Sequence, residues 1–280
     1  MTTTAGQLKE TMWVDAWVRW ERNSMEVYDD GDAGASADDE DEEELPPTAE
    51  SYTFTYPNPA KSDDQNACDI KLELEGYHDD SEQTWSSTGL TLWRSSHHLC
   101  QHLVSDEAKM LQDTSNQNLR ILEVGSGLGR CGLLAHRLSH ENATTILTDG
   151  DTDTLKQLRK NVKNNTKDDD DIISCRQLLW GEDYAKTFLM QQPQETKFDI
   201  ILGSDLIYVQ SVIRPLFETV RVLLSTTTES KFLMAHCSRR EGNEVELSMV
   251  LDLADEEGFE YEALIEEDDI SVLCFKRKRC

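Results

Sequence analysis

The chain has 280 residues, with 27 basic against 55 acidic side chains and a formal net charge of −28 at pH 7. This length suits one large domain or two small ones and allows a sizeable buried core. The charge argues against a nucleic-acid partner and against anionic membrane surfaces, because both need clustered Lys and Arg. A positively charged protein partner is favoured, although an acidic surface also serves solubility alone.

The sequence shows no membrane or secretory segment. No apolar run approaches the ~20 residues that a membrane span needs, so we expect no membrane partner. The first ten residues lack the basic region and the apolar stretch of a secretory signal. The seven cysteines form no Cys-x-x-Cys pair, which is typical of reduced thiols. We therefore expect a monomer in the cytoplasm or the nucleus.

Two segments precede the first expected strand. Residues 1–28 carry Trp13, Trp17 and Trp20 on one helical stripe, so we predict a helix that docks on its own domain or on a partner. Residues 29–50 hold eleven acidic side chains and no basic one. Such a composition cannot bury enough apolar surface to offset chain entropy, and it predicts a disordered linker.

Residues 51–93 alternate polar and apolar side chains in three short runs, which predicts strands that form a hairpin-like lid. The runs are SYTFTY (51–56), DIKLELEG (69–76) and TGLTLW (88–93). A helix is expected next, over residues 95–111. Its His97, His98 and His102 suggest a metal site, but no motif of the His-Glu-x-x-His kind accompanies them, and we predict no metal.

Strands and helical segments alternate through the remainder of the chain, which we expect to form one domain over residues 94–280. The expected strands cover 119–124, 144–149, 171–180, 197–205 and 231–237, and the expected helices 131–140, 153–165, 212–225 and 244–258. Two last strands, 259–267 and 270–278, are joined by a short acidic turn. The order predicts an α/β fold: a Rossmann-like seven-stranded sheet, mostly parallel, with an antiparallel C-terminal hairpin.

The strongest motif follows the first strand of this domain. It reads Glu123-Val-Gly-Ser-Gly-Leu-Gly-Arg-Cys-Gly132 and leads from an apolar strand into a helix. Glycines let a ligand approach the backbone closely, beside the N–H groups that begin the helix. Asp149, twenty residues past Gly129, ends the second strand, where a carboxylate can accept hydrogen bonds from both hydroxyls of a ribose.

Two interpretations of this loop are open. A Gly-x-Gly-x-x-Gly register that begins at Gly127 satisfies the dinucleotide fingerprint, with Asp149 at the right distance for an NAD ribose. The register Glu-x-Gly-x-Gly-x-Gly that begins at Glu123 is the pattern of S-adenosylmethionine-dependent methyltransferases. The second is favoured because the strand ends at Val124 and Glu123 offers a carboxylate to a ligand amino group. The chain also lacks the Tyr-x-x-x-Lys pair of a short-chain dehydrogenase.

Four further segments follow one family's order. They are Thr91-Leu-Trp93-Arg-Ser-Ser; Thr148-Asp149-Gly-Asp with Leu155, Leu158, Asn161, Val162 and Asn165 after it; Leu179-Trp180-Gly181; and Ser204-Asp205-Leu-Ile-Tyr208. With the glycine loop, they resemble the seven-strand protein lysine methyltransferases called methyltransferase family 16, over about residues 85–278. The resemblance implies methyl transfer from S-adenosyl-L-methionine to a side-chain nitrogen of a protein substrate, foremost lysine.

The resemblance also implies roles for single residues. It places Trp93 near the methionine end of the cofactor, Glu123, Gly125 and Gly127 around the amino acid moiety, Asp149 at the ribose, Trp180 beside the adenine, and Ser204 in the segment that closes the fourth strand. Asp205 and Tyr208 match the family's acidic-x-x-aromatic signature at the mouth of the active site. One departure is Arg94, which stands where the family often has proline.

The chemistry fits these assignments. Methyl transfer from a sulfonium is an in-line displacement that needs a positioned, neutral amine, whereas a lysine at pH 7 is almost all ammonium. Asp205 can attract and orient that ammonium, and Tyr208 can line its channel by cation–π contact. The alternative for Asp205 is a strand-end acid that caps a following helix. For the whole chain, the alternatives are an NAD(P)-dependent oxidoreductase and a binding module without turnover.

Overall fold

The computed structural model describes residues 49–58, 68–77, 87–113, 118–166, 172–238, 245–267 and 269–279. The predicted Trp-striped helix and residues 29–48 of the predicted linker lie outside these ranges. In the described ranges, no helix is long and apolar enough to cross a membrane.

Seven strands form one central sheet in the order β5-β4-β3-β6-β7-β9-β8. The strands are β3 (Arg120–Glu123), β4 (Thr144–Asp149), β5 (Ile173–Gln177), β6 (Ile200–Ser204), β7 (Lys231–Cys237), β8 (Phe259–Glu267) and β9 (Ile270–Arg277). Strands β3 to β7 are parallel, and β9 is antiparallel to both β7 and β8. This arrangement confirms the predicted α/β fold, the mostly parallel sheet and the antiparallel C-terminal hairpin.

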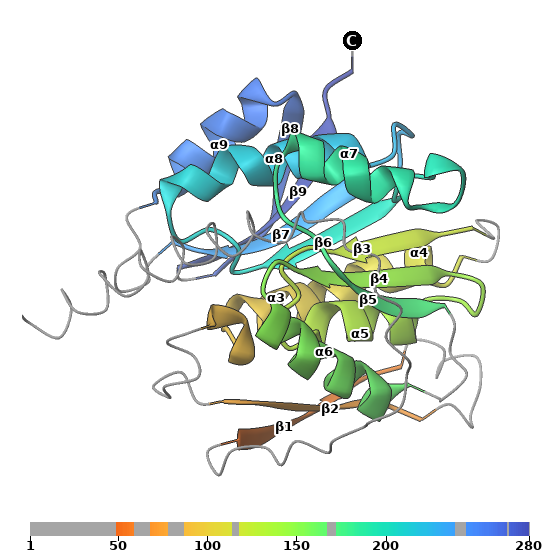
Figure 1. Ribbon diagram of the computed structural model, residues 1–280. Helices are drawn as coiled ribbons and strands as arrows, with labels where there is room; N and C mark the ends of the chain where they lie inside the picture. The colour runs from red at the N-terminus through yellow and green to blue at the C-terminus, as the bar shows by residue number, and fades with distance from the viewer. Residues whose placement is uncertain are drawn as a thin grey trace, which may run out of the picture.

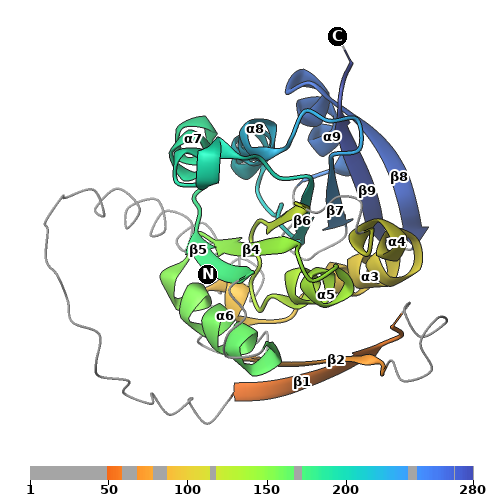
Figure 2. The same ribbon diagram turned by 90° about the vertical axis from the view of Figure 1, so that its right-hand side faces the viewer.

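Helices cover both faces of the sheet (Figure 1). One face carries α3 (Ser95–His102), α4 (Ala108–Leu111), α5 (Arg130–Leu138) and α6 (Thr152–Asn165), and the other α7 (Glu182–Met190), α8 (Ile213–Leu223) and α9 (Leu247–Glu256). Short helical turns lie at Thr88–Leu90, Leu103–Glu107, Pro193–Glu195 and Gln210–Val212. Strands β1 (Ala49–Tyr56) and β2 (Ile70–Tyr77) form a separate antiparallel pair outside α5 and α6, as the turned view shows (Figure 2).

Alternation along the strands divides the core between the two faces of the sheet. In β3, Ile121 is buried in the cluster on the α5 and α6 side, and Leu122 in the cluster on the α7 to α9 side. Helix α8 buries Ile213, Leu216 and Phe217 along one stripe at helical spacing. Each strand thus packs against helices on both faces, and this packing determines its register in the sheet. The register in turn determines which residues lie at the strand ends, where a site can form.

Amide side chains of α6 dock the outer strand pair. The amide of Asn165 accepts the N–H of Glu73 at 2.9 Å and donates to its carbonyl at 2.6 Å. Asn161 makes the same two contacts with Glu75, at 2.9 and 3.0 Å. A part-buried edge of β2 is thus paired by side chains where another strand would otherwise be needed.

Three details differ from the sequence expectation. The predicted strand at 88–93 is wrong: Thr88–Leu90 is a single 3-10 turn, in which a side chain on Gly89 would lie 2.5 Å from Thr154. The predicted buried strand at 171–180 is short, because β5 is an edge strand whose last residues are exposed. Helix α7 was not predicted, since only Ala185 and Phe188 are buried and its apolar stripe is weak.

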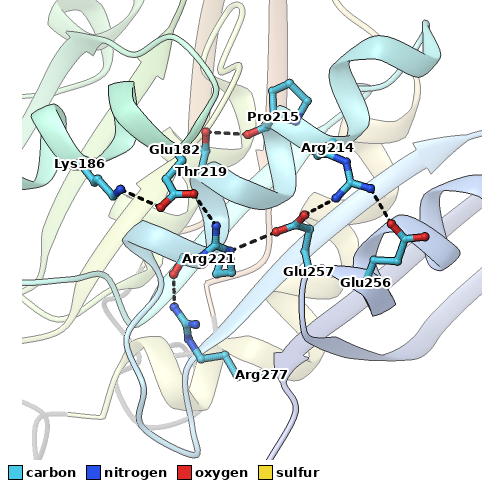
Figure 3. Close-up of polar contacts among 9 residues, drawn as sticks. All are labelled: Glu182, Lys186, Arg214, Pro215, Thr219, Arg221, Glu256, Glu257 and Arg277. Carbon is cyan, nitrogen blue, oxygen red and sulfur yellow. Dashed lines mark hydrogen bonds and ion pairs between the residues drawn. The ribbon is translucent and has the colours of Figure 1, made fainter.

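Charged side chains join the three helices α7, α8 and α9, which cover one face of the sheet (Figure 3). Arg221 of α8 donates to Glu182 of α7 at 2.9 Å and to Glu257, which follows α9, at 3.1 Å. Arg214 donates to the same Glu257 at 2.6 Å. Exposed pairs of this kind are each worth little, but together they hold three helices in one orientation.

Arg277 ends β9 and caps the C-terminus of α8. Its Nη2 donates to the carbonyl groups of Arg221 and Leu224, the latter at 2.8 Å, and its Nε donates to that of Ser225 at 3.3 Å. The last carbonyl groups of a helix have no partner within the helix, and a cation there also meets the negative end of the helix dipole.

We expect Arg277→Ala to lower the free energy of unfolding by about 1–3 kcal/mol, the range for a lost charged hydrogen-bond donor. The matched control is Lys278→Ala, which removes an exposed ion pair with the Asp255 carboxylate and an exposed hydrogen bond to its carbonyl, and should change stability by less than about 0.5 kcal/mol. Urea unfolding of both variants measures the difference. Equal effects of the two substitutions would contradict the capping role.

Candidate active site

A cavity of about 310 Å³ opens at the carboxyl ends of the parallel strands. Its walls are the loop after β3, the ends of β4 and β6, the segment after β5, and residues 87–93. The chain passes from β3 to β4 on one side and later crosses to β6 on the other, so the strand order reverses here. Open α/β sheets bind ligands at such a switch point.

The cavity brings together all nine residues that the sequence analysis singled out. Its lining includes Trp93, Glu123, Gly125, Gly127, Asp149, Trp180, Ser204, Asp205 and Tyr208. They come from segments far apart in the sequence, and the sheet gathers them at one edge.

The glycine loop is shaped by backbone conformations that favour glycine. Gly125, Gly127 and Gly129 have φ angles of +59°, +52° and +87°. A side chain at Gly125 would also lie 3.3 Å from the ring of Trp180, and one at Gly127 would lie 3.1 Å from the carbonyl oxygen of Gly89. The loop therefore presents bare backbone to the cavity.

The end of β4 holds the loop in place. A carboxylate oxygen of Asp149 accepts the N–H of Gly127 at 3.1 Å, and the carbonyl of Thr148 accepts that of Ser126 at 2.8 Å. The Thr148 hydroxyl donates to the carbonyl of Glu123 at 2.7 Å. The other Asp149 oxygen accepts the N–H of Asp151, in the loop that follows β4, at 3.1 Å. Its carboxylate thus both fixes the loop and faces the cavity.

Glu123 is a buried acid with an unsatisfied oxygen. Its side chain is 2% exposed, and in the described part of the chain its Oε2 has no hydrogen-bond partner. Burial raises the pKa of Glu123 to about 8, so the group holds a proton at neutral pH when no cation is beside it. Burial also raises the pKa of Asp149 to about 6, although backbone N–H groups act against that shift. Both acids are arranged to receive a donor or a positive charge.

Asp205 connects β6 to α3. Its φ of +55° is unusual for a residue with a side chain, and such strained residues cluster at functional sites. Its two carboxylate oxygens accept the Ser95 hydroxyl at 2.8 Å and the Ser95 N–H at 2.9 Å. Asp205 therefore caps a helix, but one that precedes it in the chain, so the alternative of a cap on the following helix is wrong.

Residues 87–93 form one rim of the cavity. The indole of Trp93 donates to the carbonyl of Thr88 at 2.9 Å, which closes this segment on itself. The Ser87 hydroxyl donates to Asp151, the N-cap of α6, at 2.9 Å. None of the described residues of β1 or β2 lines the cavity, so this irregular rim covers it where a strand lid was expected.

The histidines of α3 do not gather into a metal site. In the described ranges, no three His, Cys, Asp or Glu residues are placed to hold one ion. His98 faces Glu267 at 3.6 Å, and His97 contacts Arg130 at 3.3 Å.

A family model described as lysine methyltransferase matches residues 78–252, more than half of the chain. The chain belongs to the lysine methyltransferase family. This result confirms the family that the motifs indicated.

Relatives within the family are moderately similar to this chain. It is 30% identical over 141 residues to protein N-lysine methyltransferase METTL21A of Xenopus tropicalis, covering 49% of this chain and 57% of that protein. It is 30% identical over 156 residues to protein-lysine N-methyltransferase EFM3 of Chaetomium thermophilum, covering 55% and 44%. The chain thus spans about half the length of the curated relatives it matches.

Among solved structures, the 16S rRNA N2 methyltransferase RsmC of T. thermophilus, in complex with AdoMet and guanosine, matches with a TM-score of 0.51 and 15% identity. The match covers 82% of this chain and 51% of that one. It shows a shared fold, in agreement with the strand order.

Sequence reasoning assigned no role to Arg130, which also lines the cavity. Arg130 is 6% exposed and is the first residue of α5. One signal was available, since the N-terminus of a helix disfavours a positive charge and an arginine there needs an explanation.

Glu123 makes the stability of the unliganded protein depend on pH. Its pKa rises from 4.5 to about 8 on folding, so the folded state binds more protons than the unfolded state between these values. The free energy of unfolding therefore falls as pH rises through this window. We expect Glu123→Gln to remove this loss, so that its stability relative to wild type increases between pH 5.5 and about pH 8.5 in urea unfolding. A difference that stays constant over this range would contradict the burial of an ionisable group.

Proposed function

We propose that the protein is an S-adenosyl-L-methionine-dependent methyltransferase that modifies a side-chain nitrogen of a protein, foremost lysine. One observation carries the proposal: a cavity in a chain of the lysine methyltransferase family joins a left-handed glycine loop, the Asp149 carboxylate and the unsatisfied Glu123. When bound, the cofactor supplies an electrophilic methyl group on a sulfonium.

The residues present fit such a cofactor along the whole cavity. Trp180 lies against Gly125 and offers a flat face to an adenine. Asp149, the last residue of β4, offers a carboxylate to the ribose hydroxyls. The unpaired oxygen of Glu123 suits the α-ammonium group, whose charge would keep that carboxyl ionised.

Charge favours this cofactor over a nicotinamide dinucleotide. The cavity is lined by five carboxylic acids and one arginine, and by the weakly acidic Cys131 and Tyr208. The carboxylic acids are Glu123, Asp149, Asp151, Asp153 and Asp205, and the arginine is Arg130. A sulfonium is positive, whereas a pyrophosphate brings two negative charges into the same acidic space. The acidic lining therefore supports the methyltransferase over the oxidoreductase alternative.

For transfer to lysine, the chain has to bring the amine in line with the methyl group. Asp205 and Tyr208 line the cavity beside the cofactor residues. Both carboxylate oxygens of Asp205 already accept hydrogen bonds from Ser95, which makes this group a poor base. It therefore attracts and orients the ammonium, and water takes the proton. Tyr208 adds an aromatic wall that favours a cation. Positioning of this kind supplies most of the rate gain in such a displacement.

The test uses the full chain with methyl-labelled S-adenosylmethionine and a protein extract depleted of methylation. We expect label in protein that hydrolysis releases as methyl-lysine. Asp205→Asn should lower the rate by about 100-fold because charge and alignment are lost. Its affinity for S-adenosylhomocysteine, measured by calorimetry, should stay within about threefold of wild type.

Label recovered as methyl-histidine or at an N-terminal amine would contradict lysine as acceptor. An Asp205→Asn variant with full activity would contradict the role of that carboxylate.

A further inference from the structure

Arg130 is a buried cation surrounded by neutral groups. Its Nε donates to the Tyr56 hydroxyl at 2.8 Å and its Nη1 to that of Ser96 at 3.3 Å. Its Nη2 lies 3.3 Å from Nδ1 of His97, and the guanidinium carbon lies 3.8 Å from the centre of the Phe54 ring. Burial and the nearby guanidinium both lower the pKa of His97, which keeps this histidine neutral at pH 7.

No carboxylate balances this charge, and the buried Cys100 thiol is an acidic group whose charged form it favours. In the described part of the chain, no carboxylate lies within ion-pair distance of Arg130, although this residue is only 6% exposed. The residue also begins α5, where the helix dipole adds to the cost of a cation. Buried charges in proteins are normally paired, so a carboxylate bound at this guanidinium would be stabilised.

Such a carboxylate has room in the cavity already described. Arg130, its contact Ser96 and its neighbour Cys131 all line that cavity, as does Glu123. A guanidinium binds a carboxylate through two parallel N–H donors, and this residue has donors beyond the three that neutral groups use. It also repels an ammonium, so it is poorly suited to the channel that a lysine would enter.

We propose that Arg130 binds the α-carboxylate of the cofactor's amino acid moiety. The inference rests on the proposed function and extends it. Glu123 and Arg130 then divide the recognition of one zwitterion: the buried acid takes the ammonium and the buried guanidinium takes the carboxylate. The pair would select a cofactor with an intact amino acid end.

Calorimetry with two ligands tests this assignment. S-adenosylhomocysteine carries the carboxylate, and decarboxylated S-adenosylhomocysteine lacks only that group. We expect Arg130→Met to weaken binding of the first by about 10- to 100-fold, the range for a lost charged hydrogen bond. Binding of the second should change by less than about threefold.

Three controls separate contact from structure. Asp149→Asn should weaken both ligands, since both contain the ribose. Arg137→Met changes the other arginine of α5, whose contact is the carbonyl of Asn165 at 3.1 Å, and should leave both affinities unchanged. If Arg130→Met does not fold, Arg130→Lys keeps the charge but loses the planar fork, and it should show a smaller loss confined to S-adenosylhomocysteine.

Equal weakening of both ligands by Arg130→Met would overturn the inference, because it would mean that the residue acts only through α3 and β1. Unchanged binding of both would overturn it as well. If the wild-type protein binds neither ligand, the proposed function itself fails, and that outcome is distinct because it precedes any effect of substitution.

Discussion

The site depends on a backbone constraint: the chain must turn sharply between β3 and α5 with three residues at positive φ. Gly125, Gly127 and Gly129 meet this constraint without strain. The turn brings the N–H of Gly127 to Asp149 on the neighbouring strand and leaves the Glu123 carboxyl buried beneath the loop. A side chain at Gly125 would meet Trp180 and one at Gly127 would meet the rim at Gly89, whereas one at Gly129 would lie 2.6 Å from Leu158.

The same edge of the sheet links stability to function through shared groups. Asp205 caps α3 and lines the cavity, so this helix cannot shift without moving a residue of the cavity wall. Arg130 likewise joins β1, α3 and α5 while it lines the cavity. The buried, unsatisfied acid at Glu123 costs stability in the empty protein, and a bound cation offsets that cost. Groups that are costly without a ligand are what a binding site is expected to contain.

Much of the site was predictable because its signals are local. The glycine loop, the acid at the end of β4 and the Ser204-Asp205 segment each follow an apolar run, and the carboxyl ends of parallel strands meet at one edge. The seven-stranded sheet followed from the alternation of strands and helices. Trp93 and Trp180 required the family resemblance, since an isolated tryptophan has no spacing that reveals a ligand.

The remaining features depend on contacts between distant segments. The sequence around Thr88–Leu90 has the alternating pattern of a strand, but the segment forms a 3-10 turn. The turn brings Gly89 so close to Thr154 that a side chain would not fit there, and this contact cannot be seen in the local sequence. Asp205 caps a helix that begins 110 residues earlier. Arg130 is held in place by a hydrogen bond to Tyr56, which lies 74 residues before it in the chain. No local pattern contains these pairs, because the sheet creates them when it folds.

The most direct test of the account is a crystal structure of the full chain with S-adenosylhomocysteine. We expect ligand density in the cavity at the carboxyl ends of β3, β4 and β6. The ribose hydroxyls should lie within hydrogen-bond distance of the Asp149 carboxylate, roughly 3 Å, with the adenine against Trp180 and the sulfur directed toward Asp205. Density at another place, or a ribose turned away from Asp149, would contradict it.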